Sequence, residues 1–188
     1  MHLVLFDVDG TLVDSQHMIV AAMNAAFAEV GLPAPTRAAT LSVVGLSLDE
    51  AMTTLLGTGD GPVKALGEAY KGAYFALRHG GGPQEALYPG ALEAIDRLSA
   101  RDDVLLGLAT GKSKRGVRAI LDLHDLHGRF VTIQCADDHP SKPHPSMVVT
   151  ALAETGVAPE KAVILGDTVF DVTMGRSAGI LALGVSWG

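Results

Sequence analysis

Short runs of apolar residues recur along the chain and are separated by longer segments of mixed polarity. Each run is rich in Val, Leu and Ile and shows no strict alternation with polar residues. Continuous hydrophobicity of this kind is typical of strands that are buried on both faces of a parallel sheet. The pattern predicts five strands, over Leu3–Val8, Val104–Ala109, Phe130–Gln134, Ala162–Leu165 and Leu181–Val185.

Segments with the periodicity of amphipathic helices lie before and between the later runs. The segment that ends at Thr155 is followed by Gly156, a residue type that commonly ends helices. Strands that alternate with helices predict an α/β fold in which helices cover a five-stranded parallel sheet. The expected helices are Pro89–Ala100, Ser113–Leu123 and Pro145–Thr155.

About ninety residues separate the first two predicted strands, where a crossover between parallel strands needs about a dozen. We therefore predict a smaller domain inserted at residues 15–86, with residues 1–14 and 87–188 forming the core. The insertion has a helical pattern throughout, and Ser47–Glu50 has the sequence of a capping box. The expected helices are Gln16–Val30, a segment from Thr36, a segment that opens at Ser47, and Pro62–His79.

Two glycine-rich joints, Gly57–Gly61 and Gly80–Gly82, lie within the predicted insertion. Neither joint has the spacing of a phosphate-binding loop, and neither follows a predicted strand. We interpret both as loops or hinges.

Composition narrows the classes of protein that remain. The chain has 188 residues, of which 48% are hydrophobic and 19% charged, as in globular domains. Its net charge of −7 argues against nucleic acid as the main partner.

The N-terminal residues Met1–Phe6 are apolar but lack a basic flank and are followed by Asp7. We therefore expect neither a signal peptide nor a membrane span, and we expect a cytoplasmic protein. Cys135 is the only cysteine, which excludes an internal disulfide. The sequence leaves a monomer and a homodimer equally open.

Polar side chains stand at the ends of the first four predicted strands. In an open parallel sheet the carboxyl ends of the strands meet at one edge, where ligands bind. Two acids one residue apart follow the first strand, and a lysine lies in the loop after the third. The residues expected to converge there are Asp7, Asp9, Thr110, Gly111, Lys142, Asp167 and Asp171.

These side chains point to a cation and an oxyanion. Carboxylates crowded together repel one another unless a cation compensates them, and a set of oxygen ligands suits Mg²⁺. The hydroxyl of Thr110, the amides at the start of the Ser113 helix and the ammonium of Lys142 could hold an anion beside it. Phosphate fits this description best.

Four segments resemble the motifs of the haloacid dehalogenase-like hydrolases, in the order of that superfamily and each at a predicted strand end. They are Asp7–Thr11, Ala109–Gly111, Ser141–Pro143 and Gly166–Asp171. The resemblance covers essentially the whole chain and implies a three-layer Rossmann-like core with a small helical cap. The return through Leu87–Gly90 is similar to the phosphoglycolate phosphatase-like branch. Relatives continue with a helix after the last strand. If the protein ends at Gly188, we expect one face of the sheet to be partly bare and Trp187 to mark an exposed patch.

The resemblance also implies roles for individual residues. Asp7 would be the nucleophile that forms an aspartyl-phosphate, and Asp9 the general acid and base. Thr110, Gly111 and Lys142 would hold the phosphoryl group. The cap loop around Gly45 and Ser47 would carry specificity. The Mg²⁺ ligands would come from Asp7, the backbone carbonyl of Asp9, Asp167 and Asp171, the last through water or by orienting the lysine.

Differences within the family favour a phosphatase. Dehalogenases lack an acid two residues after the nucleophile, where this chain has Asp9. The segment Val43–Asp49 lacks the lysine that phosphonoacetaldehyde hydrolases use. Leu48 stands where mutases related to β-phosphoglucomutase carry an arginine. The expected substrate is a small phosphorylated metabolite, with 2-phosphoglycolate first. A promiscuous sugar-phosphate phosphatase, a mutase-like enzyme and a non-catalytic phosphate-binding module remain as alternatives. The cations that could read a substrate carboxylate are Arg37, Lys64, Lys71 and Arg78.

Overall fold

All five predicted strands form and join in one parallel sheet. In the computed structural model, which describes residues 1–57 and 61–188, the strand order is β5-β4-β1-β6-β7, so the first strand lies at the centre. The first strand ends two residues earlier than predicted, because Val8 belongs to the loop that carries the acids, and β5 begins two residues later. The strands are β1 (His2–Phe6), β4 (Val104–Thr110), β5 (Thr132–Cys135), β6 (Ala162–Gly166) and β7 (Leu181–Gly184).

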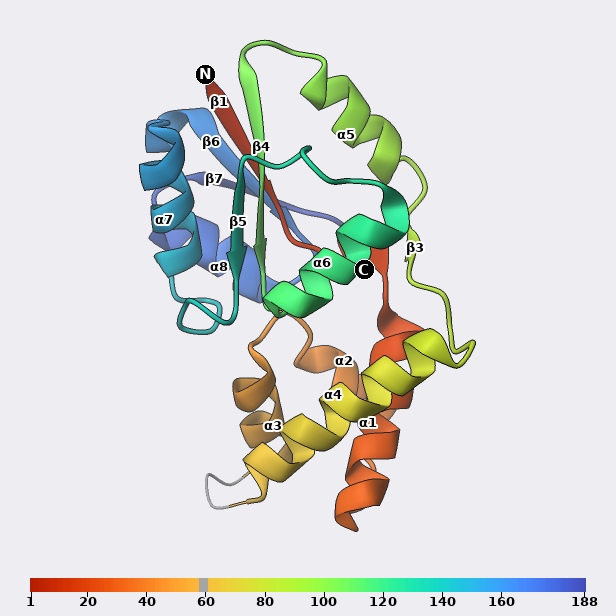
Figure 1. Cartoon of the computed structure of the whole chain (residues 1–188). Coiled ribbons are helices and arrows are strands. Elements are labelled where there is room, and N and C mark those ends of the chain that lie inside the picture. The colour runs from red at the N-terminus through yellow and green to blue at the C-terminus, as the bar shows by residue number, and fades with distance from the viewer. Residues whose placement is uncertain (58–60) are drawn as a thin grey trace.

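Helices cover both faces of the sheet, which confirms the predicted α/β fold class (Figure 1). Side chains alternate along β1, so Val4 and Phe6 belong to one apolar cluster while Leu3 and Leu5 belong to another. Helices α5 and α6 contribute to the first cluster, and α7 and α8 to the second. These helices are α5 (Ala91–Ser99), α6 (Lys114–His124), α7 (Ser146–Thr155) and α8 (Val169–Ser177), with a short 3₁₀ turn at Pro159–Lys161.

The helices described between β2 and β3 lie beyond the carboxyl ends of the strands (Figure 1), and we call residues 16–79 the cap. Their apolar centre contains Met23 and Phe27 from α1 together with Met52 and Leu66. The exact division into core and cap domains stays a prediction. The cap helices are α1 (Gln16–Val30), α2 (Arg37–Ser42), α3 (Leu48–Leu56) and α4 (Val63–His79).

The capping box predicted at Ser47 is wrong. Ser47 does precede α3, but among the described residues its side chain makes no capping bond, and its backbone N–H donates to Ser141 Oγ at 2.8 Å instead. A capping box does form at the start of α8, where the side chains of Thr168 and Asp171 each bond the backbone of the other. Of the glycine-rich joints, Gly80–Gly82 is a loop, and the joint at 57–61 has its central residues, 58–60, outside the described residues.

A two-stranded ribbon, which the sequence did not predict, pairs the segment that leaves the core for the cap with the segment that returns from the cap. Strand β2 (Val13–Asp14) pairs antiparallel with β3 (Ala86–Leu87), with Val13 opposite Leu87. Each strand has two residues, which is too short to show a hydrophobic period. The ribbon holds the outgoing and returning chain together beside the loop that carries Asp7 and Asp9.

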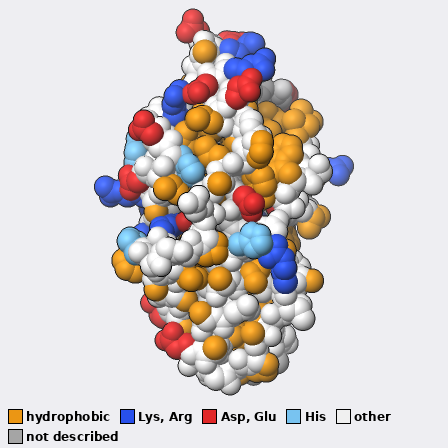
Figure 2. Space-filling model, turned by 90° about the vertical axis from the view of Figure 1, so that its right-hand side faces the viewer, with side chains coloured by type: hydrophobic (Ala, Val, Ile, Leu, Met, Phe, Trp, Pro, Cys, Tyr) orange, Lys and Arg blue, Asp and Glu red, His pale blue; other side chains and the backbone are white. Residues whose placement is uncertain are grey.

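The surface keeps some apolar side chains exposed. Figure 2 shows them gathered on the sheet-bearing half of the face that it views. Trp187 is 54% exposed, as expected for a residue that follows the last strand, and its indole N–H donates to the carbonyl of Thr11 at 3.1 Å. In the described part of the chain, none of the helices combines the length and the hydropathy needed to cross a bilayer.

Candidate active site

The loop after β1 carries Asp7 and Asp9 at the centre of the sheet edge. It turns tightly because Gly10 adopts a φ of 85°, which favours glycine. A side chain at Gly10 would also collide with Asp167, since a Cβ there would lie 2.2 Å from its Oδ2. Glycine at this position therefore allows the loop after β1 and the acid after β6 to approach one another.

Lys142 joins Asp7 to Asp171 inside the protein. Its Nζ donates to Asp7 Oδ1 at 2.8 Å and to Asp171 Oδ1 at 2.6 Å, and all three side chains are buried. Burial acts to lower the pKa of Lys142, but the two carboxylates outweigh it and raise that pKa above its usual range. The lysine is therefore a permanently charged link between the loop after β1 and helix α8.

The second oxygen of Asp7 is left without a partner. Across residues 1–57 and 61–188, Oδ2 of Asp7 is buried and makes no hydrogen bond. Burial raises the pKa of Asp7 to about 7 despite the nearby Lys142, and burial followed by repulsion from Asp171 raises the pKa of Asp167 to about 6. Both shifts show that these carboxylates lack sufficient compensating positive charge.

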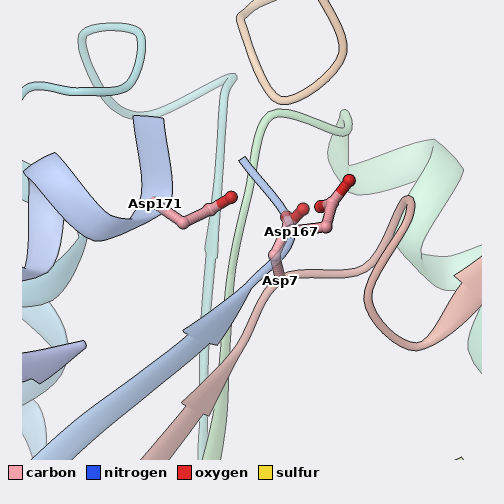
Figure 3. Close-up of side chains that lie close together, drawn as sticks. All are labelled: Asp7, Asp167 and Asp171. Atoms are coloured by element: carbon pink, nitrogen blue, oxygen red, sulfur yellow. The ribbon is translucent and has the colours of Figure 1, made fainter. Parts of the chain in front are cut away.

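Three carboxylates come close enough together to bind one metal ion. Oxygens of Asp7, Asp167 and Asp171 all lie within 4.8 Å of one another, and Figure 3 shows the side chains approaching from the ends of β1 and β6 and from the start of α8. An all-oxygen set with an unpartnered buried oxygen fits a hard divalent cation such as Mg²⁺. The prediction for Asp9 concerned its backbone carbonyl. The side-chain carboxylate of Asp9 does not belong to this group.

Asp9 instead belongs to a second polar cluster that reaches into the cap. Both of its oxygens accept from Lys112 Nζ, at 2.7 and 3.0 Å. Lys112 also lies 3.4 Å from the hydroxyl of Tyr74, which donates to Glu85, and Glu85 is buried and paired with Arg78. Burial, followed by the charge of Asp9, holds the pKa of Tyr74 far above its usual range, so its hydroxyl stays protonated.

Two of the contacts between the core and the cap loop that was predicted to carry specificity involve the backbone of the loop. At Gly111, which follows β4, a Cβ would lie 2.4 Å from the carbonyl oxygen of Gly45, so glycine is needed for this approach. The second contact is the hydrogen bond from Ser47 to Ser141. Gly45 and Ser47 therefore lie over the sheet edge, and their role in specificity stays a prediction.

A cleft of about 770 Å³ opens between the core and the cap. Asp7, Asp9 and Thr110 line it, whereas Lys142 lies fully buried against Asp7. The opposite walls come from the cap loop and from helix α4. Cleft residues that the sequence did not single out as site residues include Tyr70, Tyr74, Lys112 and Arg115.

Sequence reasoning missed the cluster around Lys112. Its position directly after Thr110 and Gly111, at a strand end, was a usable signal. Glu85 gave none, because a single acid in a polar loop has no pattern that distinguishes it from a solvated side chain, yet it is 3% exposed.

Comparison with known proteins places this geometry in a family. The sequence profile described as haloacid dehalogenase-like hydrolase matches residues 4–185, so the chain belongs to the haloacid dehalogenase-like hydrolases, as the four motifs predicted. It is therefore an enzyme of that family.

Relatives of the chain with known names include phosphatases. The chain is 33% identical to a probable phosphatase, IndB, of Dickeya dadantii, over 99% of this chain and 81% of the relative. It is 31% identical to a phosphoglycolate phosphatase of Xanthomonas campestris, over 98% of this chain and 83% of the relative. A solved haloacid dehalogenase-like hydrolase from Bacteroides fragilis shares the fold, with a TM-score of 0.90 at 23% identity over 100% of this chain and 88% of the other.

Proposed function

We propose that the protein is a Mg²⁺-dependent phosphomonoester hydrolase that acts through an aspartyl-phosphate at Asp7. The observation that carries this proposal is the arrangement around Asp7: one oxygen is fixed by Lys142, and the other is buried and without a partner among the described residues. A carboxylate held in this way beside a cleft can attack a phosphorus atom. Asp9, one residue further along the same loop, lines the same cleft.

The reaction divides into two balanced steps. In the first, an oxygen of Asp7 forms a bond to phosphorus, the bond from phosphorus to the ester oxygen breaks, and Asp9 protonates the departing oxygen. In the second, Asp9 takes a proton from water, the resulting hydroxide attacks the same phosphorus, and phosphate leaves Asp7 as a carboxylate. The alternative of a purely binding role gives no reason for two acids that both face the cleft.

The remaining residues of the site hold charge in place. Thr110 lines the cleft and its hydroxyl accepts from the backbone N–H of Lys112, so the hydroxyl proton is available to a phosphoryl oxygen. Asp171 fixes Lys142, and Lys142 fixes Asp7. Mg²⁺ bound by Asp7, Asp167 and Asp171 would neutralise their repulsion and withdraw charge from the phosphoryl group.

The leading substrate is 2-phosphoglycolate, and the relatives named phosphoglycolate phosphatases support this choice. Of the cations considered for its carboxylate, Lys71 and Arg78 line the cleft, and Arg78 is committed to Glu85. Arg37 donates to Gln16 instead. Arg115 also lines the cleft, with its guanidinium 4.8 Å above the ring of Phe75.

A sugar-phosphate phosphatase is the second candidate, because the cleft is large. Its volume of about 770 Å³ lies in the range of sites for ligands much bigger than a two-carbon acid. Leu48, in place of an arginine, continues to argue against a mutase.

The test is phosphate release from a panel of phosphomonoesters, with Mg²⁺ and with a chelator, using the wild type and Asp7→Asn. The proposal expects Mg²⁺-dependent release that disappears in Asp7→Asn. A clear preference for 2-phosphoglycolate would identify the substrate, and a broad profile over sugar phosphates would favour the second candidate. Absence of release across the panel would refute the hydrolase.

A further inference from the structure

Asp9 is not free to turn in the cleft, because Lys112 binds both of its oxygens. The two side chains come from different loops, one after β1 and one after β4, and meet with N–O distances of 2.7 and 3.0 Å. They are 14% and 9% exposed, so water competes little for the pair. A charge-assisted contact to both oxygens fixes the direction of a short carboxylate side chain.

Lys112 also faces the cap. Its Nζ lies 3.4 Å from the hydroxyl of Tyr74, 5.2 Å from the centre of that ring and 3.7 Å from Glu85 Oε1. The proton of Tyr74 goes to Glu85, so the lone pairs of its oxygen can accept from Lys112. Tyr74 belongs to α4 in the cap, and Glu85 lies directly before β3, where the chain returns to the core.

Glu85 is itself held tightly. Arg78, one turn after Tyr74 on α4, donates through Nε to Glu85 Oε2 at 2.6 Å, and His124 of α6 contacts the backbone carbonyl of Glu85 at 2.7 Å. Lys112 therefore contacts Asp9 on one side and Tyr74 and Glu85 on the other. A shift of α4 relative to the core would move the partners of Lys112 and, through Lys112, Asp9.

We propose that Lys112 is a positioning residue that aims the Asp9 carboxylate at the leaving oxygen and, through Tyr74 and Glu85, ties that aim to the position of the cap. The inference rests on the proposed function, since it matters only where Asp9 protonates a leaving group. Misplacing a catalytic group by about 1 Å is enough to lower a rate on the order of 10²-fold.

The test compares two leaving groups in Lys112→Met. An alkyl ester such as 2-phosphoglycolate needs a proton from Asp9 as its bond breaks, whereas the leaving group of 4-nitrophenyl phosphate departs as a stable anion. We expect kcat/KM for the alkyl ester to fall roughly 10–100-fold and that for the aryl ester to fall only a few-fold. The quantity kcat/KM is used because it reports the step in which the leaving group departs.

Three variants make the readout specific. Lys112→Arg keeps the charge and should restore much of the ratio between the two esters. Tyr74→Phe removes only the hydroxyl and should shift the ratio in the same direction by a smaller factor. Lys114→Met removes an exposed lysine that also pairs with an aspartate, Asp138, and should leave the ratio unchanged.

Asp9→Asn separates the failure of this inference from the failure of the proposed function. Asp9→Asn should shift the ratio by itself, and adding Lys112→Met to Asp9→Asn should shift it no further. If Asp9→Asn shifts the ratio but Lys112→Met lowers both esters equally, the positioning role is refuted and the hydrolase stands. If Asp9→Asn leaves the ratio unchanged, the acid–base role of Asp9 is wrong and the inference falls with it. Should Lys112→Met fail to fold, an unchanged ratio in Tyr74→Phe would overturn the inference.

Discussion

Two lysine–aspartate contacts at the same edge of the sheet differ in what they hold. Lys142 is completely buried, and both of its carboxylate partners, Asp7 and Asp171, come from the core. Lys112 lies at the wall of the cleft, with Asp9 of the core on one side and Tyr74 of the cap on the other. The proposed nucleophile is thus held by residues of the core alone, whereas the proposed acid–base residue lies between core and cap.

The difference follows from what each group does in the proposed reaction. Asp7 attacks the phosphoryl group, which is the same in every substrate, so its position can be built into the core. Asp9 would serve the leaving group, which differs among substrates and would face the cap residues that line the cleft. Closing the cap over a substrate would therefore also adjust Asp9.

The largest expected effect is that of Asp7→Asn, which removes the nucleophile and keeps its shape. Turnover should fall by roughly 10³-fold or more, since covalent catalysis is lost outright. The unfolding temperature should stay unchanged or rise, because an asparagine removes a buried carboxylate whose pKa is raised to about 7 by burial. Phosphate release and thermal unfolding measure the two effects, and substantial residual turnover would contradict the assignment.

Lys142→Met should break the buried contact and unfold the protein more readily. It leaves Asp7 and Asp171 unpaired in the core, and loss of one partner of a buried ion pair typically costs about 3–5 kcal/mol. Lys112→Met, at the cleft, should cost clearly less. Urea unfolding measures both free energies of unfolding, and equal losses in the two variants would refute the contrast between a buried and a cleft-facing lysine.

The stability of the metal-free protein should depend on pH. Burial raises the pKa of Asp7 from 3.8 to about 7 and that of Asp167 from 3.8 to about 6. Between pH 4 and pH 7 these two groups bind more protons in the native state than in the unfolded state, so their contribution to stability is fully present below about pH 4 and is lost as the pH rises through about 7. Mg²⁺ binds the ionised carboxylates and should restore the loss.

Thermal unfolding with Mg²⁺ and with a chelator, at pH 5 and pH 8, measures this effect. The increase in unfolding temperature caused by Mg²⁺ should be larger at pH 8. Asp7→Asn should reduce the difference between the two pH values, and an equal increase at both in the wild type would count against the three-carboxylate site.

The smallest expected effect concerns the contact between the cap loop and the core. Ser141→Ala removes the acceptor of the Ser47 backbone N–H. A hydrogen bond of this kind contributes about 1 kcal/mol, so the free energy of unfolding should change by no more than about that amount. The KM for substrate should rise while kcat changes little if, as predicted, the loop contributes to substrate specificity and takes no part in the chemistry at phosphorus. A large loss of kcat with an unchanged KM would show that this loop takes part in the chemistry.

The core could be predicted from the sequence because its signals are local. Strands buried on both faces leave continuous apolar runs, and Asp7, Thr110 and Asp167 stand at the ends of those runs, with Lys142 in the loop after the third. The three-carboxylate cluster then follows from the geometry of a parallel sheet.

What the sequence did not reveal depends on contacts between distant segments. Lys112 and Asp9 are 103 residues apart, and Glu85 is buried where Arg78 and Tyr74 of α4 bond its carboxylate. The capping box was misplaced at Ser47 because a contact with Ser141, far along the chain, takes the backbone N–H of Ser47 out of the local pattern.

The measurement that tests the account most directly is chemical trapping of the intermediate at Asp7. Enzyme quenched during turnover is treated with borohydride, which reduces an acyl-phosphate to an alcohol, and the peptides are then mapped by mass spectrometry. The account predicts reduction at Asp7, and no reduction when substrate or Mg²⁺ is omitted. Reduction at a different residue, or an unmodified Asp7 in enzyme that is turning over and accumulates an intermediate, would contradict it.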